Sequence, residues 1–513
     1  MQKKFPGMLC LWCALLSLPA FAQSPAASLS EQSSAKARAV LEASITAMGG
    51  LDALKAVNNI SRVMEGVRTD EGQGLQPIVH RSNYFETVAA PVVNRPKVHH
   101  INDQRGQRIA ESREGVILGG QPVQRRSILA EDTLFALNPE LGTFEAAKLP
   151  NPTLARANRL SRYPENLLPQ VWERPEALRY LGESHYKGRK QRVIAYANQN
   201  GAQITLYFDA QTKLLTKSEM LSDHPILGDM TDEVVYDDWR RVGKLTLPFR
   251  YVDKAGGVML QDLRASSITV DTKLDESLFA VPSGLTKMER TPLARKPTPL
   301  GKDVFLVPGA YNSIVVNFND YLLVLEAGSD NQTTENVLAQ IKEIIAPGKP
   351  IRYLVSTHFH FDHIGGVRSY IAEGTTIITT PGARQIIEQA AAAVHRRRPD
   401  ALSRNPRAPV IETLQGHRVF DDGTHRVELY EFANPHCAEM IVAWLPQEKI
   451  LFEADMLDIT YPGYVGTGGA DTAALRDKIQ SLGLAVERII PVHGHPGTMD
   501  DLRRAVAGRA ADK

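Results

Sequence analysis

The sequence predicts an α/β domain in the C-terminal part of the chain, preceded by a β-rich α+β domain. After residue 301, apolar strand-like runs alternate with helix-like segments, which is typical of a layered α/β domain. Between residues 60 and 270, strand-like segments follow one another with polar turns between them. Four prolines between residues 282 and 299 separate the two patterns, and proline-rich stretches of this kind form semi-rigid linkers.

The N-terminal end of the chain has the pattern of a signal peptide. Two lysines precede an apolar stretch, residues 8–18, and Ala20-Phe21-Ala22 fits a small-residue cleavage site. The apolar stretch is too short to span a bilayer, and an uncleaved anchor is the alternative interpretation. We therefore expect a mature chain that begins at Gln23 and lies in the periplasm or is secreted. The expected divisions are residues 1–22 for the signal peptide, 23–283 for a β-rich accessory domain, 284–300 for the linker and 301–513 for the α/β domain.

The β-rich half is expected to begin with a helical pattern over residues 32–57, punctuated by Gly49-Gly50. A hairpin is predicted around the polar turn 209–212. His99-His100 lack other ligand-type side chains nearby in the sequence, and we expect them to be surface histidines. The strands expected in this half include residues 203–208, 213–217, 233–239, 245–251 and 257–270.

The α/β half contains a dense cluster of ligand-type side chains. The run His358-Phe359-His360-Phe361-Asp362-His363 places three imidazoles and a carboxylate within six residues. A buried strand is predicted before it and a helix after it, so the cluster lies on a turn where side chains can converge. Neutral imidazole together with carboxylate suits zinc. The pattern therefore predicts a metal site, with a polar loop of incidental histidines as the alternative.

Three further candidates lie downstream. His436, Asp455 and His493 each follow a strand-like segment, as His358 does. In open α/β layers, sites gather at the carboxyl ends of strands. The other elements predicted in this half are strands 314–318, 321–325 and 351–356 and helices 333–345 and 382–395.

This order of residues resembles that of the metallo-β-lactamase-fold superfamily, over roughly residues 300–505. The shared features are the His-x-His-x-Asp-His motif, then a spaced His, Asp and His-Gly. The resemblance implies an αββα sandwich that binds two metal ions, usually zinc. It implies a first metal on His358, His360 and His436, a second metal on Asp362, His363 and His493, and Asp455 as the bridge between them.

Two neighbouring positions leave questions open. Many members of the superfamily carry an Asp in an early turn after a strand, whereas here the strand 321–325 runs into Glu326-Ala327-Gly328. Glu326 is expected to take the same supporting role with a longer side chain. His495 lies two residues after His493 and is a further candidate for the lining of the pocket.

The ligand set implies a reaction class. Two cations held close together lower the pKa of a bridging water, so that hydroxide is present at neutral pH. We expect a zinc-dependent hydrolase in which metal-bound hydroxide attacks an ester, lactone, thioester or amide bond, and in which Asp362 or Asp455 accepts the proton of the water. In the superfamily, β-lactamases usually have Cys or Ser at the position of Asp455, whereas thioesterases, lactonases and phosphodiesterases usually have Asp. Asp455 therefore favours the latter substrates without excluding a β-lactam.

A loop after Asp455 contains two further candidates. Tyr461 and Tyr464 are candidate catalytic residues that donate a hydrogen bond to a developing oxyanion. The alternative is a rigid Pro-Gly turn on which the two tyrosines pack.

Two other function classes stay open. One is a redox enzyme of the same fold that holds iron, since affinity order alone does not set which metal is bound. The other is an apolar-ligand-binding protein. Residues 239–248 and 275–282 loosely resemble the curved sheets of periplasmic lipoprotein-carrier domains, which implies a sheet that cups an apolar molecule or covers the active site. A structural or dimerising domain is the alternative.

Composition bounds the partners. The chain has 59 basic and 58 acidic residues, so nothing predicts a general affinity for nucleic acid or anionic membrane, and we expect a small-molecule substrate. The run 395–398, His-Arg-Arg-Arg, is expected to be a solvated helix end, with guidance of an anionic substrate as the alternative. Cys437 is the one cysteine outside the predicted signal peptide, which excludes an intramolecular disulfide in the mature chain. We expect it to be a buried small hydrophobe.

Overall fold

The structure is a computed structural model of the chain. It describes residues 27–69, 73–77, 93–94, 96–116, 122–289, 296–309, 311–463 and 465–511. The predicted signal peptide and Tyr464 lie outside the described residues. Within the described ranges, none of the helices combines the length and the apolar character needed to cross a membrane.

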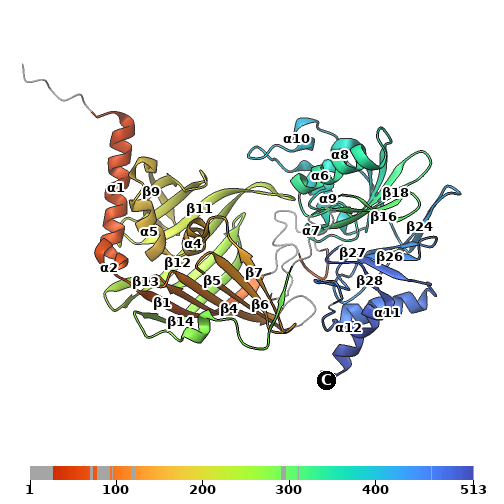
Figure 1. Ribbon diagram of the computed structural model, residues 1–513. Helices are drawn as coiled ribbons and strands as arrows, with labels where there is room; N and C mark the ends of the chain where they lie inside the picture. The colour runs from red at the N-terminus through yellow and green to blue at the C-terminus, as the bar shows by residue number, and fades with distance from the viewer. Residues whose placement is uncertain are drawn as a thin grey trace, which may run out of the picture.

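The N-terminal half is built on one large, mostly antiparallel sheet (Figure 1). Its strands lie in the order β15-β7-β6-β5-β4-β3-β1-β14-β13-β12-β11-β10-β9-β8, with β2 paired to β1. The strands are β1 (Asn59–Thr69), β2 (Val93–Asn94), β3 (Lys97–Asp103), β4 (Arg108–Val116), β5 (Pro122–Ala130), β6 (Thr133–Asn138), β7 (Thr143–Lys148), β8 (Arg179–Tyr186), β9 (Arg189–Ala197), β10 (Gln203–Asp209), β11 (Leu215–His224), β12 (Gly228–Val242), β13 (Leu245–Ala255), β14 (Val258–Val270) and β15 (Thr286–Met288). The predicted hairpin around residues 209–212 is confirmed by the antiparallel pairing of β10 with β11.

One long helix, α1, and several short ones accompany this sheet. They are α1 (Leu29–Ala47), α2 (Leu51–Lys55), α4 (Pro152–Leu160) and α5 (Pro164–Trp172), with 3-10 turns at Pro175–Ala177 and Glu276–Phe279. The helical segment expected over residues 32–57 is two helices, broken at Gly49 and Gly50, which have φ values of +125° and +95°. A side chain at Gly49 would place its Cβ 2.5 Å from the carbonyl oxygen of Lys244, so the close approach to β13 needs glycine there.

The core of this half contains a buried polar cluster. Arg62 is fully buried and forms an ion pair with the buried Glu165, and its guanidinium lies over the ring of Tyr163. His100 is 2% exposed, with its ring 4.5 Å from that of Tyr163, so the expectation that His99 and His100 are surface residues is wrong for His100. Its position on β3 turns it towards the core, a consequence of strand register that a histidine pair in the sequence does not reveal.

The C-terminal half is a sandwich of two sheets with helices on the outside (Figure 1). The first sheet has the order β16-β17-β18-β19-β20-β21-β22 and the second the order β23-β24-β25-β26-β27-β28. Apolar side chains of both sheets and of the covering helices form one core cluster. The α/β prediction and its αββα layering are confirmed for this half.

The elements of the sandwich have the following bounds. The strands are β16 (Thr298–Gly301), β17 (Val304–Pro308), β18 (Asn312–Asn317), β19 (Leu322–Leu325), β20 (Ile351–Val355), β21 (Thr376–Thr379), β22 (Val410–Thr413), β23 (His417–Asp421), β24 (Arg426–Glu431), β25 (Ile441–Leu445), β26 (Ile450–Glu453), β27 (Arg488–Pro491) and β28 (Gly497–Thr498). The helices are α6 (Asn331–Gln340), which continues as a π-helical turn (Ile341–Ile345), α7 (Phe361–Ile364), α8 (Val367–Glu373), α9 (Ala383–Ala392), α10 (Ala401–Arg404), α11 (Ala470–Ser481) and α12 (Met499–Ala511). Residues 284–300, expected as a linker, include β15 of the large sheet and most of β16 of the sandwich.

The two halves contact each other through the β11–β12 hairpin. Ile226, at its tip, is fully buried in the core cluster of the sandwich. His395 is 3% exposed, and its Nδ1 lies 2.7 Å from Asp223 Oδ1. The backbone N–H groups of Arg396 and Arg397 donate to the Asp229 carboxylate, each at 3.0 Å. The basic run at 395–398, expected as a solvated helix end, therefore begins as part of the contact between the two halves.

Candidate metal centre

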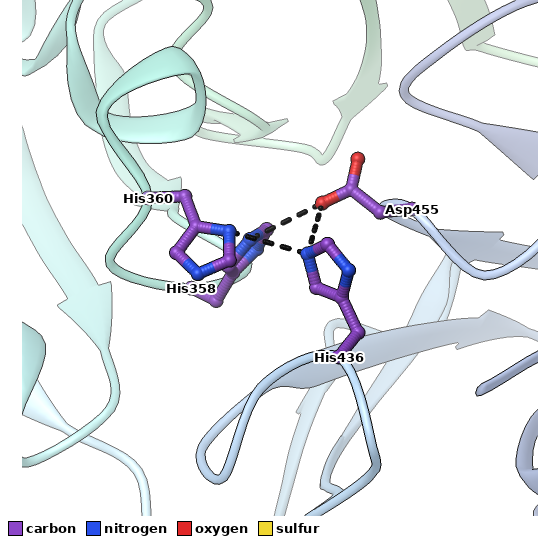
Figure 2. A group of neighbouring side chains, drawn as sticks. All are labelled: His358, His360, His436 and Asp455. Carbon is purple, nitrogen blue, oxygen red and sulfur yellow. Dashed lines mark hydrogen bonds and ion pairs between the residues drawn. The ribbon is translucent and has the colours of Figure 1, made fainter. Parts of the chain in front are cut away.

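The first ligand group lies at the ends of β20, β24 and β26. His358 follows β20 by three residues, and His360 is the residue before α7. Figure 2 shows these two rings turned towards His436 and Asp455, which come from the loops after β24 and β26. His436 Nε2 lies 3.2 Å from His360 Nδ1 and 3.0 Å from Asp455 Oδ2. One ligand-type atom from each of the four side chains lies within 4.8 Å of the other three.

A second group adjoins the first. It consists of Asp362 and His363 from α7 and His493 from the loop after β27. His493 Nε2 lies 3.2 Å from His363 Nε2 and 3.5 Å from Asp362 Oδ2. These three side chains also present atoms within 4.8 Å of one another.

Asp455 contacts histidines of both groups. Its Oδ2 lies 3.2 Å from His358 Nε2 and 3.1 Å from His363 Nε2. Its Oδ1 lies 2.8 Å from His493 Nε2. This carboxylate therefore occupies the place that a residue shared between two cations needs.

The glycines after the motif allow this packing. A Cβ on Gly365 would lie 1.9 Å from the carbonyl oxygen of Ser329, and one on Gly366 would lie 2.0 Å from Thr334 Oγ1. Because glycine has no side chain, the turn from α7 to α8 can pack closely against the loop after β19. That contact brings the loop of Glu326 next to the histidines.

Glu326 orients the His363 ring of the second group. Its fully buried carboxylate accepts hydrogen bonds from Thr357 Oγ1 at 2.6 Å and from the Ala327 backbone N–H at 2.9 Å, and its Oε2 lies 3.1 Å from His363 Nδ1. A proton on His363 Nδ1 leaves the lone pair of Nε2 facing Asp455 and His493. Glu326 has φ = +80°, a strained value for a residue with a side chain, which costs on the order of 1–3 kcal/mol and is typical of functional sites.

Electrostatics separates the histidines into two pairs. Burial lowers the pKa of His360 to about 3 and holds the pKa of His358 well below its usual value, so both rings are neutral at pH 7. For His363 and His493, burial also disfavours the charged form, but the carboxylates of Asp455 and Asp362 outweigh it. The pKa of His363 is held well above its usual value, and that of His493 is raised to about 9. Positive charge is therefore favoured on the two rings beside the carboxylates of Asp362 and Asp455, those of His363 and His493.

The donor set fits a divalent cation. Imidazole nitrogens and carboxylate oxygens are the ligands that zinc and similar ions prefer. His358 Nδ1 lies 3.2 Å from Thr357 Oγ1, while its buried Nε2 points into the group, 3.2 Å from Asp455 Oδ2 but without hydrogen-bond geometry. A buried ring nitrogen left without a hydrogen bond is costly unless something else binds it, and a cation does so.

The other predicted site residues lie differently. The Tyr461 hydroxyl donates a hydrogen bond to Glu145 Oε1 of β7 at 2.6 Å, so it is engaged in a contact between the two halves, and its catalytic role stays a prediction. His495 belongs to neither ligand group among the described residues. Cys437 is fully buried, as expected, and burial raises the pKa of its thiol to about 12.

Sequence reasoning missed three neighbours of the cluster. The ring of Tyr311 stacks parallel to His363 and meets the ring of His493 edge-on, with a centroid distance of 4.2 Å to the latter. Gln73 and Gly74, from the segment after β1, hydrogen-bond to residues of the motif. Tyr311 lies just before a predicted strand, which was the one available signal. Gln73 and Gly74 carry none, because they lie about 285 positions away in the sequence.

The chain is similar to known proteins over part of its length. Residues 306–495 match the family model described as the metallo-beta-lactamase superfamily. A linear primary-alkylsulfatase from Pseudomonas sp. (strain ATCC 19151) is 38% identical over 52 residues, which are 10% of this chain and 10% of that protein. A metallo-beta-lactamase structure from Pontibacter korlensis is 19% identical, with a TM-score of 0.33, and the match covers 42% of this chain and 97% of that one. A metallo-beta-lactamase structure from Hirschia baltica is 18% identical, with a TM-score of 0.31, and the match covers 41% of this chain and 95% of that one.

Proposed function

We propose that this chain, whose residues 306–495 match the model of the metallo-beta-lactamase superfamily, is a periplasmic or secreted hydrolase with two zinc ions per chain. It cleaves an ester, lactone, thioester or amide bond. The observation that carries this proposal is the position of Asp455, which contacts histidines of both ligand groups. A carboxylate in contact with both ligand groups is the arrangement that two neighbouring cations would share.

The residues have distinct tasks in this reaction. His358, His360 and His436 would hold one cation, Asp362, His363 and His493 the other, and Asp455 both. Bound there, the cations supply Lewis acidity, which activates water and polarises the oxygen of the substrate. Asp362 and Asp455 would keep carboxylates beside the attacking water, and one of the two would accept its proton. Thr357 and Glu326 hold the rings of His358 and His363 in place.

The class of bond follows from the carboxylate at position 455. As the resemblance implies, Asp at this position favours esters, lactones and thioesters over β-lactams. The alkylsulfatase relative adds a sulfate ester to the substrates worth testing, although the match spans a tenth of each protein. A first panel therefore contains a p-nitrophenyl ester, a lactone, a thioester, a primary alkyl sulfate and a chromogenic β-lactam.

Elemental mass spectrometry of the purified mature protein, supplied with zinc, is the primary test. We expect about two zinc ions per chain and hydrolysis of at least one member of the panel. About one iron per chain, without hydrolysis, would move the assignment to the redox alternative. No bound metal after zinc is supplied would contradict the proposal.

A matched pair of variants connects the metal to these residues. His358→Ala removes a buried ligand, and we expect it to lose zinc and hydrolysis while its far-ultraviolet circular dichroism spectrum is retained. His185→Ala, at an exposed position of β8 in the N-terminal sheet, is the control. Equal zinc content and turnover in both variants would refute the assignment.

A cavity in the N-terminal half favours a second, separate function. Its volume is about 830 Å³, and it is lined by residues of α4 and α5 and of β9 to β14. Its apolar lining includes Leu167, Tyr196, Ile204, Met220, Met230 and Leu260. Apolar pockets of this size hold small molecules, so we infer that this half binds an apolar or amphipathic compound.

Extraction of the purified protein with organic solvent, followed by mass spectrometry, tests this second function. Met220→Trp, which fills the cavity, should abolish binding of a fluorescent apolar probe such as anilinonaphthalene sulfonate. Leu221→Trp is the matched control, because Leu221 is 58% exposed and is absent from the lining. Equal probe binding by the two variants would refute the cavity as the site.

A further inference from the structure

A short segment of the N-terminal half crosses the loops that carry the ligand groups. Residues 73–77, which we name the strap, follow β1 of the large sheet in the sequence. Gln73 Nε2 donates a hydrogen bond to Asp362 Oδ1 at 2.7 Å. The carbonyl oxygen of Gly74 lies 2.9 Å from His360 Nε2. The strap thus contacts one residue of each ligand group.

Two further contacts fix the strap in place. The backbone N–H of Ala438, two residues after His436, donates to the carbonyl oxygen of Leu75 at 2.8 Å. The ring of Pro77 lies so close to Gly382 that a Cβ there would be 2.2 Å from Pro77 Cγ. The strap therefore joins the loop after β20 to the loop after β24, which belong to different sheets of the sandwich.

We propose that Gln73 and Gly74 are positioning residues of the metal centre, so that the N-terminal half completes a site whose ligands all lie in the C-terminal half. This inference rests on the proposed function. Hydrogen bonds from residues that do not themselves bind the metal set the orientation and basicity of its ligands. Their loss typically lowers metal affinity about 10–100-fold.

The contact with Gly74 selects the ring nitrogen that His360 presents. A carbonyl oxygen can only accept, so its partner Nε2 must carry the proton. Nδ1 then offers its lone pair, and this is the nitrogen that lies 3.2 Å from His436 Nε2 inside the first group. Because His360 is fully buried, a flipped ring would lose this hydrogen bond without water to replace it.

The contact with Gln73 gives the two oxygens of the Asp362 carboxylate different partners. Oδ1 accepts from the amide, while Oδ2 faces His493 at 3.5 Å and His363 at 3.7 Å. The amide prevents the carboxylate from rotating Oδ2 away from the second group. Its N–H also favours the charged form of this carboxylate, which burial opposes.

The test compares Gln73→Leu and Gln73→Ala with Gln76→Leu. Gln76 is an exposed residue of the same strap and serves as the matched control. Leucine keeps the bulk of the side chain and alanine removes it, so a packing artefact would separate the two Gln73 variants. Zinc affinity is measured by competition with a chromophoric chelator, and Co²⁺-substituted protein gives a visible spectrum that reports ligand geometry.

We expect both Gln73 variants to bind one of their two zinc ions at least about 10-fold more weakly than the wild type, with an altered Co²⁺ spectrum. The other ion, the Gln76 variant and the thermal midpoint of each metal-free variant should be unchanged. Zinc affinities and Co²⁺ spectra equal to those of the Gln76 variant would overturn the inference, as would a loss of affinity matched by a lower metal-free midpoint. A wild-type protein that binds no zinc would instead overturn the proposed function, so the two failures are distinguishable.

Discussion

Replacing Glu326 by glutamine tests how the buried layer beneath the histidines supports the metal centre. Glu326 is fully buried, and its two oxygens take three contacts, from Thr357 Oγ1, His363 Nδ1 and the Ala327 N–H. Glutamine has nearly the same shape but only one acceptor oxygen. With the NH₂ group at the Oε2 position, it faces His363 Nδ1, and a lone pair on His363 Nε2 is no longer enforced. With the NH₂ group at the Oε1 position, it faces the Ala327 N–H, and the remaining oxygen is a neutral acceptor for His363 Nδ1.

The magnitude follows from these contacts. A buried donor left without its acceptor costs about 1–3 kcal/mol in the free energy of unfolding. Loss of the outer partner of a ligating histidine lowers metal affinity by about 10–100-fold, which corresponds to about 1.4–2.8 kcal/mol. We therefore expect Glu326→Gln to weaken binding of one zinc ion by at least about 10-fold. Glu326→Asp keeps the charge but shortens the arm, and it should also lose affinity because one carboxylate no longer reaches all three donors.

Two assays separate stability from metal binding. Urea unfolding of the metal-free proteins gives the stability term, and zinc competition with a chromophoric chelator gives the affinity. Glu388→Gln on the exposed side of α9, where the side chain is 50% exposed, is the control. If Glu326→Gln binds zinc within about twofold of the control, the orienting role assigned to Glu326 is refuted.

Three further predictions concern the sandwich. Arg368→Met should lower the free energy of unfolding of the sandwich by about 3–5 kcal/mol, measured by urea unfolding. The reason is that the variant leaves the buried Asp400 carboxylate without its ion-pair partner, since Asp400 Oδ2 lies 2.5 Å from Arg368 Nε. A loss below about 1 kcal/mol would contradict this prediction. Burial opposes ionisation of Asp400, but the hydrogen bonds from Arg368 and Ser403 outweigh it and hold its pKa well below the usual value. Because the folded pKa lies below the unfolded one, this stabilisation is full above about pH 4 and is lost as the pH falls further, so Asp400→Asn should lose less stability than the wild type between pH 5 and pH 3. Removal of metal with a chelator should lower the thermal midpoint, because an ion present at 100 times its dissociation constant adds about 2.7 kcal/mol to the stability of the folded state. An unchanged midpoint would argue against a metal bound to the folded state.

Much of the candidate site could be predicted without coordinates. The motif at 358–363 is local, and each later candidate follows a strand-like segment, as His493 follows the apolar run 489–492. Strands β24, β26 and β27 run in the same direction in the second sheet, so the side chains that follow them lie at one edge of it. The tertiary structure places the residues after β20 of the first sheet beside that edge. The structure brings all seven of these residues into the two groups.

The sequence was less informative about residues whose neighbours are distant. His100 was expected at the surface because a histidine pair resembles a polar loop, yet strand register turns it into the core beside Tyr163. His395 was expected in a solvated helix end, but the β11–β12 hairpin covers it. In both cases the deciding contact comes from a segment far away along the chain.

The sequence by itself determined the candidate ligand set of the metal centre, because ligand types, their order and the strands before them are local properties. Only the tertiary structure decided how the two halves contact each other. The strap at 73–77 and the contact of Glu145 with Tyr461 pair polar groups that lie 286 to 316 positions apart. No periodicity encodes such contacts, since they arise from the way that the two hydrophobic cores are placed against each other. The acceptor that holds His360, a backbone carbonyl at Gly74, has no side-chain signature at all.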